Sequence, residues 1–458
     1  MPVSPARAAA FDILLRVERD SAYASELLHS HEREQLSTAD HALATELVMG
    51  VLRWRSRLDD EIAPVSSQPP SKLDLEILIS LRLALYQFRW LDRIPQRAAL
   101  HESVELVKRA RKRSAAPFVN AVLRKLASFP QTEPPIRNTF PEGQTTSPEA
   151  LARALAHPLW LVERWVQEYG LPATQKICRH NQAIPKTAIR IRDATAETDL
   201  LSQGVILSPA AMLASARRVE SGDITKTQPL RQGRIVIQDE ASQLVAALVG
   251  RDSGSSSKIL DCCAAPGGKT LAIADHNPQA AITAVELHAH RARLLENLLL
   301  QHDPHSSERI QIMVADAQHL PTSNSFDRVL ADVPCSGTGT LARNPEIKWR
   351  LKPEDLGELH QRQFAILRSA LAQVAAKGRL IYSTCSLEKE ENESVIEQVL
   401  EGNAAFRLID CRTELDRLKA AGELVWPDAN SLTRGPYLRT IPGIHLCDGF
   451  FAAILERD

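Results

Sequence analysis

Two cysteines in this sequence come directly after short apolar segments that are typical of buried strands. Cys335 lies in the stretch 332–337, after the run 328–331, and Cys385 follows the run 379–382. In an open parallel sheet, ligands bind and reactions occur at the carboxyl ends of the strands. A thiol at such a position can act as a nucleophile, whereas a lone cysteine elsewhere is most often a small core residue. We expect core positions for four other cysteines: Cys178, Cys262, Cys411 and Cys447.

A third strand, predicted over 258–263, ends in a turn with two adjacent glycines. Gly267 and Gly268 can adopt backbone angles that other residues avoid, and they leave no side chain in the path of a ligand. The helix that follows supplies free N–H groups. The turn matches neither the phosphate-binding pattern G-x-x-x-x-G-K-[ST] nor the dinucleotide pattern G-x-G-x-x-G. It is therefore either an ordinary glycine turn of an α/β protein or a loop for a ligand without phosphates.

Two carboxylates follow the next two predicted strands. Glu286 ends the strand over 282–287, about 20 residues beyond the glycine turn, where an acidic side chain can bond ribose hydroxyls. Asp316 follows the strand over 310–315 and could bond an adenine amino group. An adenosine site with no phosphates to hold fits S-adenosylmethionine. We therefore expect this methyl donor as the cofactor.

The thiols suit the methylation of a cytosine at C5, a carbon that is by itself a weak nucleophile. A thiolate that adds to C6 turns the ring into an enamine, and C5 can then attack a methyl sulfonium. A free thiol is mostly protonated near pH 7, so the site must lower its pKa or remove its proton as it reacts. We expect Asp332 to hydrogen-bond the N3/N4 edge of the base, which must leave its stack.

The composition limits the kind of protein that carries this chemistry. At 458 residues, with 44% apolar and 24% charged residues, the chain is expected to form several ordinary globular domains. It has no long apolar run that predicts a membrane span, and its N-terminus has no secretory pattern. We therefore expect a cytoplasmic protein with reduced thiols. No C-x-x-C pair is present, so no metal is expected. A monomer is the default.

The first 128 residues predict an all-α domain, because their apolar residues recur at helical spacing and nothing alternates like a strand. Predicted helices cover 38–60, 73–91, 98–112 and 116–127. The stretch 129–150, rich in Pro, Thr and Ser, predicts a linker. Residues 151–235 mix a helical segment at 159–165 with short strands at 187–192 and 234–238. We interpret 151–235 as a small α+β domain that binds RNA.

Residues 236–458 alternate between strand and helix signals, which predicts a Rossmann-like parallel sheet with helices on both faces. Besides the strands already named, strands are predicted at 327–332 and 379–384. Helices are predicted at 267–275, 288–301, 355–377 and 391–400. The segment 449–455 is expected to close the sheet as an antiparallel edge strand.

A net charge of -1 means that any binding of nucleic acid must use local basic patches. The densest patch lies at the end of a predicted helix, and it either contacts phosphates or is a solvated helix end. A second pair of cations alternates along the strand at 187–192, on one face. The candidate RNA contacts in these two places are Lys108, Arg109, Arg111, Lys112, Arg113, Arg190 and Arg192.

Four segments together resemble the RNA cytosine-5 methyltransferases. They are 263–269 (CAAPGGK), 332–339 (DVPCSGTG), 343–349 (RNPEIKW) and 384–386 (TCS), the last followed by 390–393 (EENE). The helical N-terminus, with FVNAVLRKL at 118–126, is similar to the NusB-like domain of one branch of that family. This branch comprises the bacterial 16S rRNA methyltransferases called RsmB, Sun or Fmu.

The resemblance implies a role for each matching residue. Cys385 matches the nucleophile, and Cys335 matches the thiol that assists release of the methylated product. Arg343 and Lys348, in the third segment, are added to the RNA contacts. The residues that match positions binding S-adenosylmethionine are Cys263, Ala264, Ala265, Pro266, Gly267, Gly268, Lys269, Glu286, Asp316 and Asp332. The family often has Asp where this chain has Glu286, and the carboxylate is kept.

The resemblance therefore predicts methylation of a cytosine in 16S rRNA. Two alternatives stay open: the same chemistry on another RNA such as tRNA, and an RNA-binding factor whose catalytic domain is inert. The two thiols at strand ends argue against an inert domain, which would have no physical need for them. DNA is disfavoured as a substrate, because the second cysteine, Cys385, has no role in that chemistry.

Overall fold

The computed structural model describes residues 3–29, 36–129, 147–251, 257–303, 305–323 and 325–458. These residues form two compact units. The first, which we call the helical unit, comprises Met1–Ile184 and Leu341–Leu351. The second, the sheet unit, comprises Pro185–Thr340 and Lys352–Asp458.

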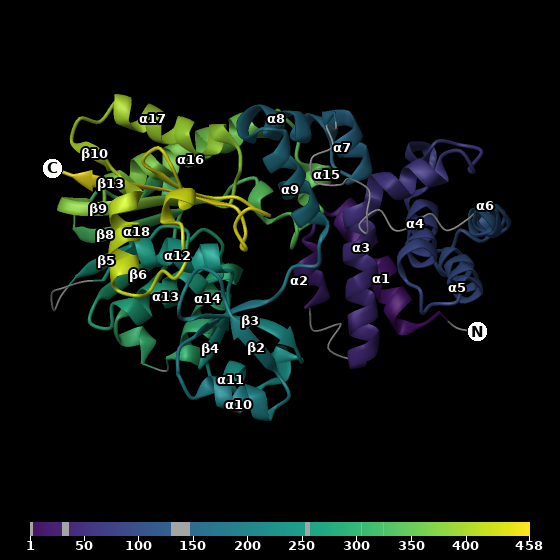
Figure 1. Cartoon of the computed structure of the whole chain (residues 1–458), viewed down its shortest axis with the longest axis horizontal. Helices are drawn as coiled ribbons and strands as arrows, with labels where there is room; N and C mark the ends of the chain where they lie inside the picture. Colours follow the sequence, from purple (N-terminus) through teal and green to yellow (C-terminus); the bar gives the residue numbers. More distant parts are fainter. Residues whose placement is uncertain (1–2, 30–35, 130–146, 252–256, 304, 324) are drawn as a thin grey trace. The chain divides into compact units, whose positions relative to one another are not determined.

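The helical unit contains no strand among its described residues, which confirms the all-α prediction for the N-terminus. Apolar side chains of the long helices form one core, in which Trp54, Leu81 and Leu123 are buried. The helices of this unit, coloured purple to blue in Figure 1 except for the green α15, are α1 (Pro5–Arg19), α2 (Ala24–Leu28), α3 (Thr38–Ile62), α4 (Leu75–Trp90), α5 (Gln96–Arg109), α6 (Ala116–Ser128), α7 (Pro148–Ala154), α8 (Leu159–Tyr169), α9 (Leu171–Gln182) and α15 (Ile347–Arg350).

The segment Leu341–Leu351 joins the helical unit although the chain on both sides of it belongs to the sheet unit. Its side chains bond the backbone of the helical unit directly. Trp349 Nε1 donates to Leu52 O at 2.6 Å, and Glu346 Oε1 accepts from the N–H of Ala24 at 2.9 Å. The chain therefore leaves the sheet unit just after the Cys335 loop, binds the helical unit, and returns.

The small α+β domain predicted over 151–235 is not a separate unit. Helices α7, α8 and α9 belong to the helical unit, and the strands that follow belong to the sheet unit. The division falls at Ile184, and the strands that follow bury Ile189 and Ile235 in an apolar cluster of their own. Of the predicted linker, residues 130–146 lie outside the described residues.

The sheet unit is built around one mixed sheet in the order β11-β12-β13-β9-β8-β5-β6-β7, with β10 paired to β13. Strands β7, β6, β5, β8 and β9 run parallel, and β13 pairs antiparallel with β9. The strands are β5 (Lys258–Asp261), β6 (Ala281–Glu286), β7 (Ile310–Val314), β8 (Phe326–Asp332), β9 (Val374–Thr384), β10 (Phe406–Ile409), β11 (Thr433–Arg434), β12 (Tyr437–Thr440) and β13 (Phe450–Arg457).

Helices cover both faces of this sheet, as the alternation of signals predicted. Successive strand residues face opposite cores: Leu380 and Tyr382 lie in one apolar cluster with α16 and α17, and Ile381 lies in the other with α12 and α13 (Figure 1). The helices are α12 (Glu240–Leu248), α13 (Gly268–His276), α14 (Ala289–His302), α16 (Asp355–Leu371), α17 (Glu393–Glu401) and α18 (Cys411–Ala420).

Two details of the predicted sheet are wrong. Strand β13 is antiparallel as expected, but it lies inside the sheet between β9 and β12. The helix predicted over 355–377 ends at Leu371, and β9 begins at Val374. The alanine-rich sequence between them has helical propensity, but β9 must start there to pair with β8.

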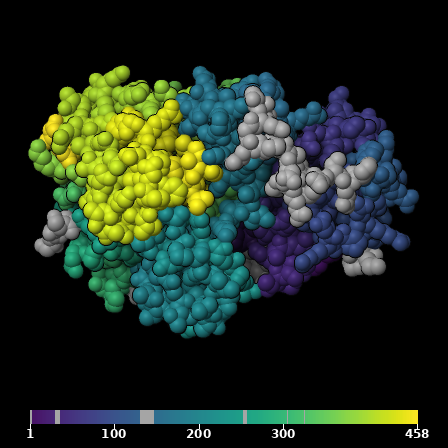
Figure 2. Space-filling view, viewed as in Figure 1, coloured from purple at the N-terminus to yellow at the C-terminus, as the bar shows by residue number. Residues whose placement is uncertain are grey.

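A second sheet of four antiparallel strands, β2-β3-β1-β4, completes the sheet unit. Its residues Ala216 and Val236 share the apolar cluster of α12 and α13, so it packs on the larger sheet's helices. In Figure 2 its teal atoms adjoin those of the C-terminal residues. Its elements are β1 (Ala188–Ile191), α10 (Ala196–Ser202), β2 (Ile206–Pro209), β3 (Ala216–Ser221), α11 (Gln228–Arg231) and β4 (Ile235–Ile237).

Candidate active site

The candidate site lies at the carboxyl ends of β5 and β8, where the order of the parallel strands reverses. From β5 the chain builds outward through β6 and β7 on one side and then through β8 and β9 on the other. In open α/β sheets the loops that diverge at this point leave a crevice that binds ligands. The glycine turn follows β5, and Cys335 and Cys385 follow β8 and β9.

The turn after β5 is fixed by close packing around its glycines. Gly267 has a φ of +112°, and an added Cβ would lie 2.7 Å from Leu295 Cδ1 on α14. A Cβ at Gly268 would lie 3.3 Å from Gln238 Nε2. Ala264 N donates to Val285 O at 2.8 Å, so the turn is also bonded to β6. The two glycines therefore let Leu295 and Gln238 pack directly against the turn, and Gly267 allows its positive φ.

Two buried polar groups beside this turn have no partner among the described residues. Gln238 is 8% exposed, and its Oε1 accepts no hydrogen bond. Asp261 Oδ2 accepts from Thr270 Oγ1 at 2.7 Å, but Asp261 Oδ1 has no partner. Burial raises the pKa of Asp261 to about 6, and the nearby charge of Asp332 adds to the effect. Gln238 Oε1 and Asp261 Oδ1 are therefore available to accept hydrogen bonds from a ligand that binds at the glycine turn.

The two carboxylates expected to bind an adenosine lie at neighbouring strand ends. Glu286 ends β6, is buried, and accepts from the N–H of His288 at 2.9 Å. Asp316 comes two residues after β7, and Ala315 N donates to Glu286 O at 3.1 Å, which keeps the two ends adjacent. The hydrogen bond from the N–H of Gln318 lowers the pKa of Asp316, so this carboxylate is ionised at neutral pH.

Lys269 and Asp332 join the glycine turn to the end of β8. Lys269 Nζ donates to Asp332 Oδ2 at 2.7 Å, and Ser383 Oγ donates to Asp332 Oδ1 at 2.6 Å. Burial opposes the charge on Lys269, but the attraction of Asp332 outweighs it, and the pKa of Lys269 is raised. Each carboxylate oxygen can accept a second hydrogen bond, and the Asp332 side chain is 24% exposed. Asp332 can therefore bind a further donor.

The two strand-end thiols lie against each other. Cys335 Sγ and Cys385 Sγ are 3.1 Å apart, and the N–H of Cys385 donates to Cys335 Sγ at 3.3 Å. Both residues are half-buried, and neither forms a disulfide. The hydrogen bond with Cys385, together with burial, raises the pKa of Cys335 well above that of a free thiol. Cys335 is therefore protonated at neutral pH and can donate a proton.

The basic patch at the end of α5 is partly neutralised by acidic neighbours. Lys108, Arg109 and Lys112 pair with Glu105, Asp12 and Asp74 at 2.7–2.8 Å. Arg111 and Arg113 are exposed, and the described residues give them no ionic partner. Surface ion pairs of this kind contribute little stability and can exchange for phosphate. The prediction that these five residues contact RNA stays a prediction.

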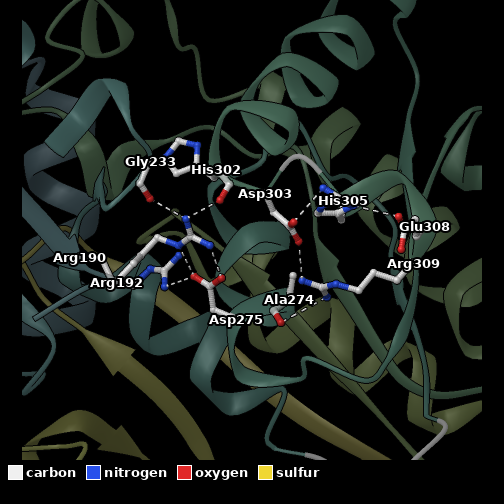
Figure 3. Close-up of polar contacts among 10 residues, drawn as sticks. All are labelled: Arg190, Arg192, Gly233, Ala274, Asp275, His302, Asp303, His305, Glu308 and Arg309. Atoms are coloured by element: carbon white, nitrogen blue, oxygen red, sulfur yellow. Dashed lines mark hydrogen bonds and ion pairs between the residues drawn. The ribbon is translucent and has the colours of Figure 1, made fainter. Parts of the chain in front are cut away.

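The arginines of β1 contradict their predicted role as RNA contacts. Figure 3 shows Arg190 and Arg192 converging on Asp275 of α13. Arg190 NH1 donates to Asp275 Oδ2 at 2.6 Å and is 4% exposed. Arg192 donates to both oxygens of Asp275 and to the carbonyls of Gly233 and His302 (Figure 3). The two side chains share one face of the strand as expected, but that face packs on α13 and binds a carboxylate instead of RNA.

Lys348 also contradicts its predicted role. It is 1% exposed, and its Nζ donates to Arg53 O at 3.0 Å inside the helical unit. Burial lowers its pKa well below the usual range for lysine. Arg343, from the same segment, is half-buried. An amine that is buried and bonded to a backbone carbonyl is not available to a phosphate at the surface.

Across the described residues, no group of three or more His, Cys, Asp or Glu side chains is arranged to hold a metal ion, and no helix is both long and apolar enough to span a membrane.

Sequence reasoning missed three polar side chains at the site: Gln238, Ser383 and Glu391. Glu391 stood in a recognised segment, but nothing in the sequence indicated what it would contact.

The fold and the site define the class of this protein: a Rossmann-like methyltransferase domain joined to a NusB-like helical domain. Residues 251–456 match the family model described as 16S rRNA methyltransferase RsmB/F, and residues 4–128 match the model of the NusB family. The "Probable ribosomal RNA small subunit methyltransferase B" of Bacillus subtilis (strain 168) is 32% identical over 477 residues, covering all of both chains.

A ribosomal RNA small subunit methyltransferase B of Cronobacter sakazakii is 31% identical, over 93% of this chain and 92% of the relative. The chain therefore belongs to the 16S rRNA methyltransferase RsmB/F family, which confirms the family expected from its motifs. Among solved structures, that of PH0851 has the same fold over the full length of both chains, with a TM-score of 0.79 and 22% identity. A methyltransferase homologue from Pyrococcus horikoshii covers 69% of this chain with a TM-score of 0.56.

Proposed function

We propose that this protein methylates C5 of a cytosine in 16S rRNA through a covalent bond between Cys385 and C6 of the base. The observation that carries the proposal is the 3.1 Å separation of Cys335 Sγ and Cys385 Sγ beside the glycine turn. One thiol suffices for addition to a pyrimidine, so a second thiol in contact with it calls for a role of its own. Release of the product supplies that role.

The chain's own groups account for the steps on the base. The thiolate of Cys385 adds to C6, and the bond electrons move so that C5 becomes nucleophilic. Asp332 accepts a hydrogen bond from the N4 amino group, and Lys269 Nζ holds the Asp332 carboxylate in place by donating to its Oδ2 at 2.7 Å. After C5 is methylated, a water molecule takes the C5 proton, the electrons of the C5–H bond restore the C5–C6 double bond, and the C6–S bond breaks with its electrons going to the Cys385 sulfur. Cys335, protonated and in contact with Cys385, is placed to assist this release by proton transfer.

The glycine turn fits S-adenosylmethionine, which when bound supplies an electrophilic methyl group. Glu286 and Asp316 would hold its ribose and adenine, and the free Oε1 of Gln238 and Oδ1 of Asp261 offer buried acceptors at the turn. These features support the choice of methyl donor.

The choice of 16S rRNA rests on the family and its relatives, whose names specify ribosomal RNA of the small subunit. The NusB-like unit supports binding to RNA, and its exposed Arg111 and Arg113 are available for phosphates. A base in a loop costs less to unstack than a base in a duplex, so we expect the target cytosine in a loop.

The test is to incubate the protein with labelled S-adenosylmethionine and unmodified 16S rRNA, and to map the labelled position. Label on one cytosine C5 supports the proposal. Label on tRNA or on an assembled subunit, with none on naked 16S rRNA, keeps the chemistry and changes the substrate. No label on any RNA, together with no binding of the donor in calorimetry, favours an RNA-binding factor with an inert domain.

Two serine variants test the roles of the thiols. Cys385→Ser should abolish turnover and leave donor binding intact, because the turn is unchanged. Cys335→Ser should accumulate a covalent protein–RNA adduct that survives denaturation, because addition proceeds and release fails. Full turnover by Cys385→Ser would refute the assignment of the nucleophile.

A further inference from the structure

One carboxylate, that of Glu391, binds the loops of both cysteines at once. Glu391 is 0% exposed and ends a short helical turn (Lys389–Glu391) just before α17. Its Oε1 accepts from the N–H of Ser336 at 2.7 Å, and its Oε2 accepts from the hydroxyls of Ser336 and Ser386. Ser336 is the residue after Cys335, and Ser386 is the residue after Cys385. Glu391 therefore bonds the residue that directly follows each of the two cysteines.

A second side chain holds the carboxylate in place. Gln363 of α16 is also fully buried, and its Nε2 donates to Glu391 Oε1 and to Pro334 O, each at 2.9 Å. All four contacts of the Glu391 carboxylate are with donors, two on each oxygen. Tyr382 OH donates to the backbone carbonyl of Glu391 at 2.6 Å and fixes the turn to β9.

The two loops make further direct contacts that depend on the same alignment. Gly339 N donates to Cys385 O at 2.9 Å, and Leu387 N donates to Thr338 Oγ1 at 2.9 Å. An added Cβ at Gly339 would collide with the backbone of Gly449. The loops are therefore packed closely, and a shift of one would move its thiol relative to the other.

We propose that Glu391 is the positioning residue that sets the separation of Cys335 and Cys385, by binding Ser336 and Ser386 in a site closed to water. The catalytic consequence of this role rests on the function proposed above. The hydrogen bonds of a buried carboxylate are charge-assisted and directional, so they fix both loops more tightly than neutral contacts would. Glu391 touches neither thiol directly and acts through the two serines.

The charge of Glu391 has the sign that this role requires. The hydrogen bond with Cys385 and burial are the main reasons why the pKa of Cys335 is raised, and the charges of Cys385 and Glu391 add to them. A negative charge behind the Cys335 loop therefore keeps that thiol protonated. This agrees with Cys335 acting as a proton donor to the departing Cys385.

The test measures thiol spacing separately from catalysis. Dibromobimane bridges two thiols only when they lie close together, and peptide mapping identifies a Cys335–Cys385 bridge in the full-length protein. Glu391→Ala should lose this bridge, and its turnover should fall by about 100-fold, the scale expected when a reacting group shifts by roughly 1 Å. Glu391→Gln should be intermediate, because serine hydroxyls can rotate to accept from an amide.

The matched control is Glu240→Ala. Glu240 is a second buried carboxylate of the sheet unit, and it binds the backbone N–H groups of residues 211–213 and the side chain of Arg218. Its loss should lower the melting temperature and leave the bridge intact. If Glu391→Ala does not fold, a double variant of Ser336→Ala and Ser386→Ala removes the two hydroxyl contacts and keeps the carboxylate.

Each outcome decides the matter. An intact bridge in Glu391→Ala, or a lost bridge in Glu240→Ala, overturns the positioning role. A bridge that depends on Glu391 in a protein that methylates no RNA supports the positioning role and refutes the proposed function. A lost bridge with turnover equal to wild type shows that the spacing has no catalytic use, and it overturns the inference.

Discussion

Two charged clusters in the sheet unit have nearly the same ion-pair geometry and different surroundings. In the first, Lys269 Nζ lies 2.7 Å from Asp332 Oδ2 at the end of β8. In the second, Arg190 and Arg192 bind Asp275 at 2.6–2.7 Å beneath the small sheet. The length of an ion pair therefore does not distinguish a reactive site from a structural contact.

The difference lies in what each carboxylate has left to bind. Asp275 accepts three N–H groups from two guanidiniums, and Arg192 also donates to the carbonyls of Gly233 and His302 (Figure 3). Arg190 has almost no exposed surface. Asp332 accepts one contact on each oxygen and is partly exposed beside two thiols and a glycine turn. Only the Asp332 cluster is equipped to receive a base.

The largest expected effect is on turnover, from Asp332→Asn. The amide keeps the shape but cannot accept on both sides, so the contact with the base is lost. We expect turnover to fall on the order of 10²–10³-fold, as when one electrostatic contact to a reacting group is removed, with little change in melting temperature. Turnover and melting of the purified variant check this. Unchanged turnover would remove Asp332 from the site.

The next effect is on stability, from Asp275→Ala. Removing one partner of a buried pair leaves Arg190 charged and unpaired, which costs about 3–5 kcal/mol of the free energy of unfolding. Urea unfolding measures this cost. Glu308→Ala is the control, because Glu308 is 74% exposed beside His305 and its loss should change little. Asp275→Ala should retain turnover below its melting temperature, and a specific loss of turnover would make the two clusters alike.

A smaller effect concerns Asp261, a carboxyl with no cation bonded to it. Its pKa is raised to about 6 in the folded protein, above its value in the unfolded chain. The folded state therefore binds this proton more tightly, and the stability it contributes is present at low pH and lost as pH rises through about 6. Relative to Asp261→Asn, the wild type should lose about 1–2 kcal/mol between pH 5 and pH 8. Urea unfolding at both pH values checks the sign, and an equal pH response in the two proteins would contradict it.

The smallest effect is expected from Lys348→Met. The amine is buried and its pKa is lowered by burial, so an apolar side chain of similar size should change stability by less than about 1 kcal/mol and leave RNA affinity unchanged. Replacing Arg111 and Arg113 by alanine should instead weaken RNA binding and reduce its salt dependence by about one counterion per lost phosphate contact. Filter binding at several salt concentrations compares the two. A weaker affinity of Lys348→Met would show that this lysine becomes exposed on binding.

Much of the site could be predicted because its residues follow strands. The apolar runs before Asp261, Glu286, Asp332 and Cys385 predict buried strands, and the ends of parallel strands meet at one edge by geometry alone. The helices that were predicted begin within a few residues of their positions in the structure, whereas α9, α12 and α18 were not predicted. The early start of β9 was missed because alanines there favour a helix, and pairing with β8 overrides that preference.

The sequence by itself determined the glycine turn and the two thiols at strand ends, because each follows an apolar run that predicts a buried strand. It also determined the helical character of the N-terminus. Only the tertiary structure decided which charged residues face solvent and which face a partner. Arg190, Lys348 and Glu391 are all hydrophilic in sequence and all buried in the fold. A charged side chain can be buried only when distant segments supply its hydrogen-bond partners, such as Asp275, the Arg53 carbonyl and the two serines. The spacing of residues in the local sequence does not predict these partners.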